Sequence, residues 1–208
     1  SEMCIRDRDN MPLAAELKAD FEWAKSIAVG PGLSMNVAAA EITRCVLERD
    51  DKVRILDADA LNIIAGEHID YKGSREGQII ITPHIMEMSR LTGKTVADIK
   101  EHMIESAKEY AIQHSCICIL KDARTVVTDG QKVYINCTGN DGMSTGGCGD
   151  VLTGLIAGMT AMGLDAFEAA CLSVYVHGKA GDYAASGKGR AGMTAADVSE
   201  AIAYVLKR

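Results

Sequence analysis

The sequence predicts an α/β protein in which helices cover both faces of a mostly parallel central sheet. Three observations carry this prediction. Short apolar runs typical of buried strands alternate with longer amphipathic segments typical of helices. Polar residues or glycines follow several of these strands, as expected where a ligand site lies at the carboxyl ends of parallel strands. The last third of the chain is helical and follows a loop with five glycines within residues 139–149.

The N-terminal half alternates between helix and strand. Glycine and proline stop the first strand at residues 30–32, and Pro83 closes a later one. A buried strand ends in the sequence "LDADAL", where two aspartates lead into a helix. The predicted order is helix 11–25, strand 26–32, helix 36–50, strand and helix within 53–65, and strand 77–84.

The C-terminal half continues this pattern and then changes. Thr95 and Asp98 resemble a capping pair at the start of a helix over 96–114, and a strand follows at 116–121. The sequence Asp129-Gly130 indicates a hairpin turn between two strands within 125–136. The remaining predicted elements are helices at 150–162, 164–185 and 194–206.

Composition limits the classes of function. Twenty-two basic and 29 acidic residues give a net charge of −7, and no basic run suggests a nucleic-acid surface. No apolar run reaches the roughly 18 residues of a membrane span. Seven cysteines without C-x-x-C spacing favour reduced thiols in a cytoplasmic protein over disulfides or a metal site. Small molecules are therefore the expected partners. The length of the chain favours a single domain.

The glycine-rich loop carries the strongest chemical signal. Glycine loses more backbone entropy on folding than other residues, so Gly146, Gly147 and Gly149 before a helix indicate close approach of the main chain to a ligand. Free N–H groups there can bind an anion. Asp150 at the helix start has two interpretations, a capping residue or a carboxylate that reaches the reacting group, and the glycines favour the second. The G-x-x-x-x-G-K-[ST] and G-x-G-x-x-G patterns of other nucleotide sites are absent.

Five segments together resemble a known family. The sequences "IAVGPGL", "ILDADALNIIA", "ITPHIMEMSRLTG", "ILKDARTVVTDG" and "GNDGMSTGGCGDVLTGLIAG" follow one another in the order and spacing of the ADP/ATP-dependent NAD(P)H-hydrate dehydratases. The resemblance runs from about residue 11 to the C-terminus. It implies a ribokinase-like three-layer α/β/α sandwich. Members have a longer N-terminal part, so the resemblance also implies that early strands are missing here.

The resemblance implies a specific reaction. The phosphate of ADP or ATP, with Mg²⁺, is transferred to the C6 hydroxyl of hydrated NADH or NADPH, and elimination restores the cofactor. Asp150 resembles the catalytic aspartate, which also contacts the substrate. Gly32 and His84 resemble substrate contacts. The nucleotide-binding residues implied by the resemblance are Lys121, Asp122, Ala123, Arg124, Thr125, Gly146, Gly147 and Gly149.

Several positions depart from the family pattern. His84-Ile85-Met86-Glu87 stands where His-Pro-Gly-Glu is usual, which puts two bulky apolar residues into a turn. Asp122 replaces a glycine and adds a negative charge beside the expected phosphate site. Ser34 replaces the last glycine of G-P-G-L-G. Cys148 replaces a threonine and is interpreted either as a reactive thiol at a helix start or, preferably, as a tolerated small side chain.

Other polar residues leave alternatives open. Asp57 and Asp59 fit a metal site, or turn formation and helix capping, and one of them is expected to orient the site. No metal-binding residue is predicted. His177 and Lys179 lie within a long helix and are interpreted as structural.

Two further functions compete with the dehydratase. One is a ribokinase-like small-molecule kinase acting on hydroxymethylpyrimidine or hydroxyethylthiazole, and the other is an inactive nucleotide-binding fragment. We predict a non-native or disordered start at 1–10, a single partial domain at 11–208, and a homo-oligomer, a tetramer by the resemblance.

Overall fold

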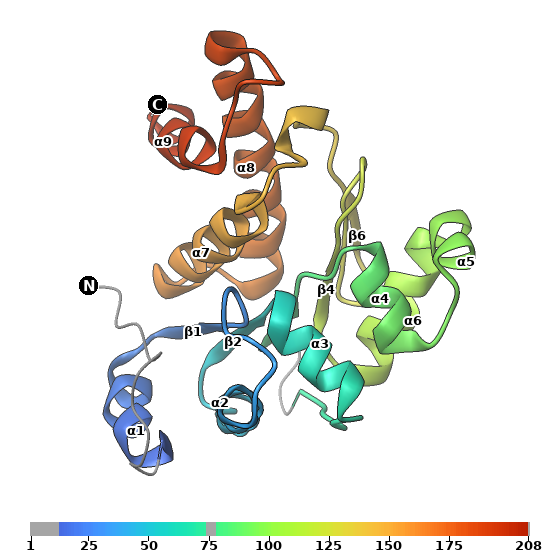
Figure 1. Ribbon diagram of the computed structural model, residues 1–208, viewed down its shortest axis with the longest axis vertical. Coiled ribbons are helices and arrows are strands. Elements are labelled where there is room, and N and C mark those ends of the chain that lie inside the picture. The colour runs from blue at the N-terminus through green and yellow to red at the C-terminus, as the bar shows by residue number, and fades with distance from the viewer. Residues whose placement is uncertain (1–12, 74–77, 208) are drawn as a thin grey trace.

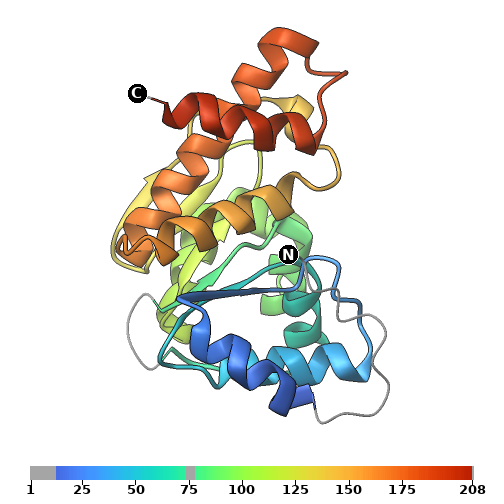
Figure 2. The same ribbon diagram turned by 90° about the vertical axis from the view of Figure 1, so that its left-hand side faces the viewer.

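The computed structural model describes residues 13–73 and 78–207 and shows three layers (Figures 1 and 2). Helices α7 (Cys148–Ala161) and α8 (Ala166–Lys188) cover one face of a central sheet, and the helices of the N-terminal half cover the other. Residues 1–10, predicted to be non-native or disordered, lie outside the described residues, as do residues 11 and 12 of the first predicted helix and Gly77 of a predicted strand. The three-layer α/β/α prediction is confirmed.

The sheet is mostly parallel, as predicted. The six strands of the described residues lie in chain order. β1 to β4 pair in parallel, whereas β5 pairs antiparallel with both β4 and β6. The strands are β1 (Ser26–Val29), β2 (Val53–Leu56), β3 (Ile79–Ile81), β4 (Ile117–Leu120), β5 (Val126–Thr128) and β6 (Val133–Ile135). Because four parallel strands end at one edge, the residues that follow them meet there.

Alternate residues of the strands pack into two separate cores. Ile55, Ile80 and Ile117 face α7 and α8. Leu56 and Ile81 face the opposite layer of helices. This double burial explains the near-continuous apolar strands, since a parallel sheet covered on both faces has no solvent-facing side. The helices of the opposite layer are α1 (Leu13–Trp23), α2 (Val37–Leu47), α3 (Ala58–Gly66), α4 (Ile85–Thr92), α5 (Val96–Glu101) and α6 (Met103–His114).

Two helical features differ from the sequence prediction. Residues 85–92 form α4, to which the sequence analysis assigned no element, and His84 caps this helix. The helix predicted over 96–114 is divided into α5 and α6 because His102 between them has a non-helical ψ of 48°. Short propensity patterns cannot locate such a break, since the two halves keep the same apolar periodicity.

The C-terminal helices extend the layer beyond the sheet. α9 (Ala195–Leu206) packs on α8 around Val198 and Ala201, away from the strands (Figure 1). Thr194 and Asp197 form a capping box at its start. Among the described helices, none combines the length and the low polarity that a bilayer crossing requires.

Candidate functional site

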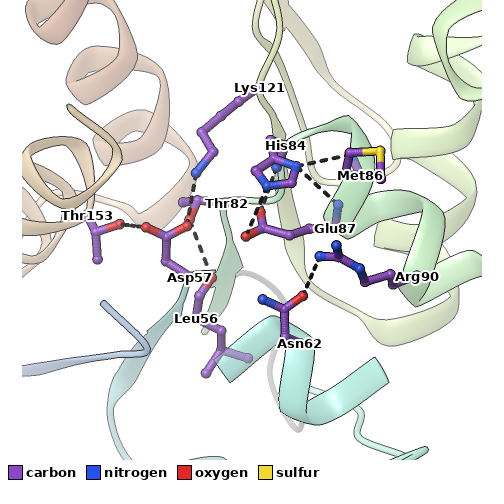
Figure 3. Close-up of polar contacts among 10 residues, drawn as sticks. All are labelled: Leu56, Asp57, Asn62, Thr82, His84, Met86, Glu87, Arg90, Lys121 and Thr153. Atoms are coloured by element: carbon purple, nitrogen blue, oxygen red, sulfur yellow. Dashed lines mark hydrogen bonds and ion pairs between the residues drawn. The ribbon is translucent and has the colours of Figure 1, made fainter. Parts of the chain in front are cut away.

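A buried ion pair lies where β2 and β4 end. Asp57 follows β2 and Lys121 follows β4, and the Lys121 Nζ lies 2.9 Å from Asp57 Oδ1 (Figure 3). The Thr153 hydroxyl on α7 donates to the other carboxylate oxygen at 2.7 Å. The Asp57 side chain is 2% exposed and that of Lys121 is 22% exposed. Asp57 therefore joins the sheet to α7 and fixes the lysine ammonium at the sheet edge.

The surroundings of Asp57 favour its charged form. Burial alone would raise the pKa of this carboxyl, but the Lys121 charge and hydrogen bonds from Thr82, Lys121 and Thr153 outweigh burial and hold the pKa below its usual value. Asp57 is therefore a carboxylate at neutral pH. Of the two aspartates that the sequence analysis left open, Asp57 is the one that orients a functional group.

His84 follows β3 and forms the start of α4. Its Nδ1 accepts hydrogen bonds from the main-chain N–H groups of Met86 and Glu87 at 3.0 and 3.1 Å, and Glu87 accepts one from the His84 N–H at 2.8 Å (Figure 3). Since Nδ1 is an acceptor, the proton of the neutral ring lies on Nε2. Burial raises the pKa of Glu87, against the opposing effects of the His84 N–H and the Lys121 charge. As the N-cap of α4, His84 keeps a half-exposed imidazole ring at the carboxyl end of β3.

Glycines bring the main chain close to these charges. A Cβ at Gly30 would lie 1.7 Å from the Asp57 carbonyl oxygen, so only glycine lets the loop after β1 pass there. A Cβ at Gly149 would lie 3.5 Å from Lys121 Nζ. Gly147 has a φ of +89° at the start of α7. The first turn of α7 and the lysine ammonium thus face the same space, which is the geometry expected of an anion site.

A cavity of about 940 Å³ opens beside Lys121. Seven residues that the sequence analysis named as binding residues line it: His84, Lys121, Asp122, Ala123, Arg124, Thr125 and Gly149. The lining also includes residues that were missed, in the 136–145 loop, on α7 and α8, and at Arg190. The glycines of the 136–145 loop could have indicated that this loop lines the site. The others come from distant helices whose approach the sequence does not specify.

Four predicted site residues do not line this cavity. Gly32 has a φ of +64° and lies in an exposed loop with open space around its Cβ position. Gly146 is exposed and Gly147 lies against Ala195. Asp150 is exposed on the first turn of α7, one residue after Gly149. Asp150 directly follows Gly149, which lines the cavity, and its catalytic role stays a prediction.

The departures from the family pattern have local explanations. Ser34 keeps a glycine-like φ of +72°, and its N–H donates to the Asp59 carboxylate at 2.7 Å. Ile85 is buried in the core, whereas Met86 is about half exposed. Asp122 is exposed in the cavity lining, and Lys121 pairs with Asp57 instead.

Cys148 is not an activated thiol. Burial raises the pKa of Cys148, with a smaller opposing effect of a main-chain hydrogen bond at Thr145. Its side chain packs with Ala180 and Met193 at the contact of α7 with α8 and α9. This supports the interpretation of Cys148 as a tolerated small residue.

The 177–182 segment of α8 shapes the far wall of the cavity. The Asp182 carboxylate accepts hydrogen bonds from the Gly139 N–H and the Asn140 amide, both at 3.1 Å. A Cβ at Gly178 would lie 2.2 Å from Thr138 Oγ1 and 2.7 Å from the Thr138 carbonyl carbon. The 138–140 loop is therefore held directly against the helix. From the sequence, His177 and Lys179 were expected to be structural, and the contact of this part of the helix with the site was not predicted.

Gly178→Ala is expected to destabilise the protein by about 1–3 kcal/mol, because the new methyl group overlaps the main chain of Thr138 and the loop must move. Gly187→Ala in the same helix is the matched control, since nothing lies within 4 Å of its Cβ position. That change should be neutral or stabilising by up to about 1 kcal/mol. Urea unfolding measures both, and equal effects of the two substitutions would contradict the close packing.

No group of three or more His, Cys, Asp or Glu side chains suited to a metal ion is found in the described parts of the chain. The Asp57 carboxylate is paired with the Lys121 ammonium. Asp59 lies apart from this pair in its contacts, since its carboxylate accepts a hydrogen bond from the Ser34 N–H.

Comparison with known proteins gives concordant matches. A family model described as NAD(P)H-hydrate dehydratase matches residues 5–204. The chain is 45% identical over 183 residues to the bifunctional NAD(P)H-hydrate repair enzyme Nnr of Moorella thermoacetica, which covers 87% of this chain and 34% of that protein. The chain thus spans about a third of the length of this bifunctional relative.

Two solved structures share the fold. The ADP/ATP-dependent NAD(P)H-hydrate dehydratase of Bacillus subtilis, co-crystallised with ATP/Mg²⁺ and soaked with CoA, matches with a TM-score of 0.80 and 34% identity over 88% of this chain and 66% of that one. A ribokinase-like superfamily protein of Enterococcus faecalis matches with a TM-score of 0.82 and 27% identity over 93% of this chain and 66% of that one. The predicted ribokinase-like fold is therefore confirmed.

Proposed function

Because this chain belongs to the NAD(P)H-hydrate dehydratase family, we propose that it carries the nucleotide-dependent dehydration of hydrated NADH or NADPH. In this reaction ADP or ATP supplies a phosphoryl group to the C6 hydroxyl of the damaged nicotinamide ring. Loss of that phosphate together with the ring proton on the neighbouring carbon restores the reduced cofactor. The observation that carries the proposal is the convergence of Lys121 Nζ and the first turn of α7 on one cavity.

The cavity beside Lys121 is the proposed nucleotide site. Its volume of about 940 Å³ is within the range of small-molecule and cofactor sites. Lys121 is held in place by the buried Asp57 carboxylate, so its ammonium is positioned before the ligand arrives. Fixed positive charge and helix N–H groups stabilise the charge that develops on a transferred phosphoryl group. A Mg²⁺ ion would be carried on the nucleotide phosphates, since Mg²⁺ in such sites is usually bound by one or two carboxylates together with substrate phosphates.

Asp150 is the proposed general base. Asp150 is exposed in the first turn of α7. The residue before it, Gly149, lines the nucleotide cavity. We place the hydrated nicotinamide beside the exposed Asp150, with Gly32 as a further expected contact. The carboxylate there would take the proton of the C6 hydroxyl as its oxygen attacks the terminal phosphorus. His84 would contact the substrate through its exposed imidazole edge.

The cellular setting follows the same proposal. A metabolite-repair enzyme of this kind is expected in the cytoplasm, where its substrates form, and as a homo-oligomer. Sedimentation velocity on the purified chain would test the second expectation, because a monomer at micromolar concentration would contradict it.

The reaction products distinguish this function from the alternatives. Incubation of the chain with hydrated NADH, Mg²⁺ and ADP or ATP should restore the absorbance of NADH and release one inorganic phosphate per molecule restored. A kinase of the same fold would instead accumulate a stable phosphorylated alcohol from hydroxymethylpyrimidine or hydroxyethylthiazole. Binding of ATP without either product would identify the nucleotide-binding fragment and refute the dehydratase proposal.

A further inference from the structure

A second cavity, of about 490 Å³, lies where the loop after β1 meets α3 and α4, and we call it the Arg90 pocket. The residues that line it come from these three segments and are Met35, Asn62, Ala65, Gly66 and Arg90. They are separate from the residues that line the nucleotide cavity. Two of the three segments also carry proposed substrate contacts, since Gly32 lies in the loop of Met35 and His84 starts the helix of Arg90.

The loop wall of the Arg90 pocket is tied to the rest of the fold. The Ser34 N–H donates to the Asp59 carboxylate at 2.7 Å, which holds the loop to the first turn of α3. Met35, next to Ser34, is more than half exposed and adds an apolar side chain to the lining. The pocket is therefore a formed feature of the fold, with apolar surface around a single cation.

That cation, the Arg90 guanidinium, has no acidic partner in residues 13–73 and 78–207. Its Nη1 donates to Oδ1 of Asn62 at 2.8 Å, and this amide is neutral (Figure 3). Glu87, on the same helix, accepts a hydrogen bond from the His84 N–H instead. Asn62 therefore fixes the guanidinium without neutralising it, and most of its five N–H donors remain for a ligand. The planar fork of an arginine fits a phosphate group well.

The spacing along α4 indicates which phosphate of the proposed substrate reaches Arg90. Hydrated NADH and NADPH are dinucleotides, in which one ribose separates the nicotinamide ring from the pyrophosphate. His84 is the N-cap of α4, and Arg90 lies about 9 Å farther along the helix axis at roughly 1.5 Å per residue. That separation is on the scale of one ribose. The 2′-phosphate of NADPH lies beyond the pyrophosphate and the second ribose, and therefore farther from a ring held at His84.

We propose that the Arg90 pocket binds the pyrophosphate of the hydrated dinucleotide and that Arg90, held by Asn62, is the residue that contacts it. The inference rests on the proposed function, which supplies the dinucleotide. It gives the two ligands of the reaction separate phosphate sites: the phosphates of ADP or ATP bind near Lys121, and those of the substrate bind at Arg90.

Two substitutions distinguish phosphate binding from structural support. Arg90→Gln removes the guanidinium. Asn62→Asp keeps the oxygen that accepts from Arg90 but makes it negative, so an ion pair still joins α3 to α4 while the cation is neutralised. A purely structural contact would be kept or strengthened by this second change, whereas a phosphate site would be impaired. Lys100→Gln is the matched control, because Lys100, like Arg90, is a cation in the last turn of its helix but lines neither cavity.

The experiment measures kcat and KM of the full chain for hydrated NADH and hydrated NADPH at saturating ATP and Mg²⁺. Arg90→Gln should raise KM roughly 10- to 100-fold for both substrates, the range expected for a hydrogen bond between charged groups. The value of kcat should change much less, because the pyrophosphate takes no part in the chemistry at C6. Asn62→Asp should also raise both KM values, and Lys100→Gln should leave them unchanged. If urea unfolding shows that Arg90→Gln does not fold, Asn62→Asp still decides, since it keeps the contact between the helices.

Four results would overturn the inference. They are an unchanged KM in Arg90→Gln, an unchanged KM in Asn62→Asp, a rise for hydrated NADPH alone, which would assign Arg90 to the 2′-phosphate, and an equal rise in the KM for ATP, which would assign Arg90 to the nucleotide. In each of these cases wild type still restores NADH, so the proposed function survives. Failure of wild type to convert either dinucleotide would refute both.

Discussion

Turnover of hydrated NADH is expected to fall by about 10²- to 10⁴-fold when Asp150 is replaced by asparagine, the range that a positioned general base contributes. The amide cannot accept the proton of the C6 hydroxyl, and a neutral hydroxyl is a poor nucleophile toward phosphorus. Nucleotide affinity should stay within a few-fold of wild type, because Asp150 is not among the residues that line the cavity. The measurement is NADH absorbance under saturating ATP, together with an ATP titration.

Asp98→Asn is the matched control for this change. Asp98 occupies the same position as Asp150, the third residue of a helix, and is likewise exposed, but it lies on α5 outside the cavity. Both variants lose a carboxylate from the positive end of a helix and should lose a similar, small amount of stability. Wild-type turnover in Asp150→Asn would remove this residue from the mechanism, and an equal loss in Asp98→Asn would show that the effect is not specific to the site.

The largest loss of stability is expected for Lys121→Met. This change leaves the Asp57 carboxylate, 2% exposed, without its opposite charge. Breaking a buried ion pair from one side typically costs about 3–5 kcal/mol. We expect a value toward the lower end, because Thr153 still donates a hydrogen bond to the carboxylate. Urea unfolding at pH 7 measures the loss, and the same variant should bind ATP more weakly because the cavity loses its ammonium.

The pH dependence of this loss has a defined sign. In wild type the pKa of Asp57 is lowered, so its contribution to stability is fully present above the unfolded value, about 3.9, and disappears as the pH falls through the folded value. Without Lys121, burial is the largest remaining influence and raises the pKa. The variant therefore loses stability as the pH rises above about 4, and the gap to wild type should close in acid.

The double variant Asp57→Asn with Lys121→Met serves as the control for charge. It removes both members of the pair, and the asparagine still bonds Thr153, so part of the lost stability should return. A double variant less stable than Lys121→Met at pH 7 would show that the loss comes from packing of the lysine stem instead of the unpaired carboxylate.

Much of the fold was predictable because its signals are local. The strands at 53–56 and 117–120 were predicted from apolar runs between helical patterns, and Asp129-Gly130 predicted the hairpin. The helix α4 was missed because its start depends on the side chain of His84, which is an uncommon N-cap. The break at His102 was missed because it does not disturb the apolar periodicity of its neighbours.

The sequence by itself determined the three-layer fold, the family, and the segments at the strand ends, since each is written in residues that are close together in the chain. Only the tertiary structure decided that Asp57 pairs with Lys121, 64 residues away, and with Thr153, 96 residues away. It likewise decided that His177 lines the cavity and that the main chain of Thr138 packs directly against Gly178. These contacts depend on how α7 and α8 pack on the sheet, and side-chain packing across that interface leaves no periodic trace in the sequence.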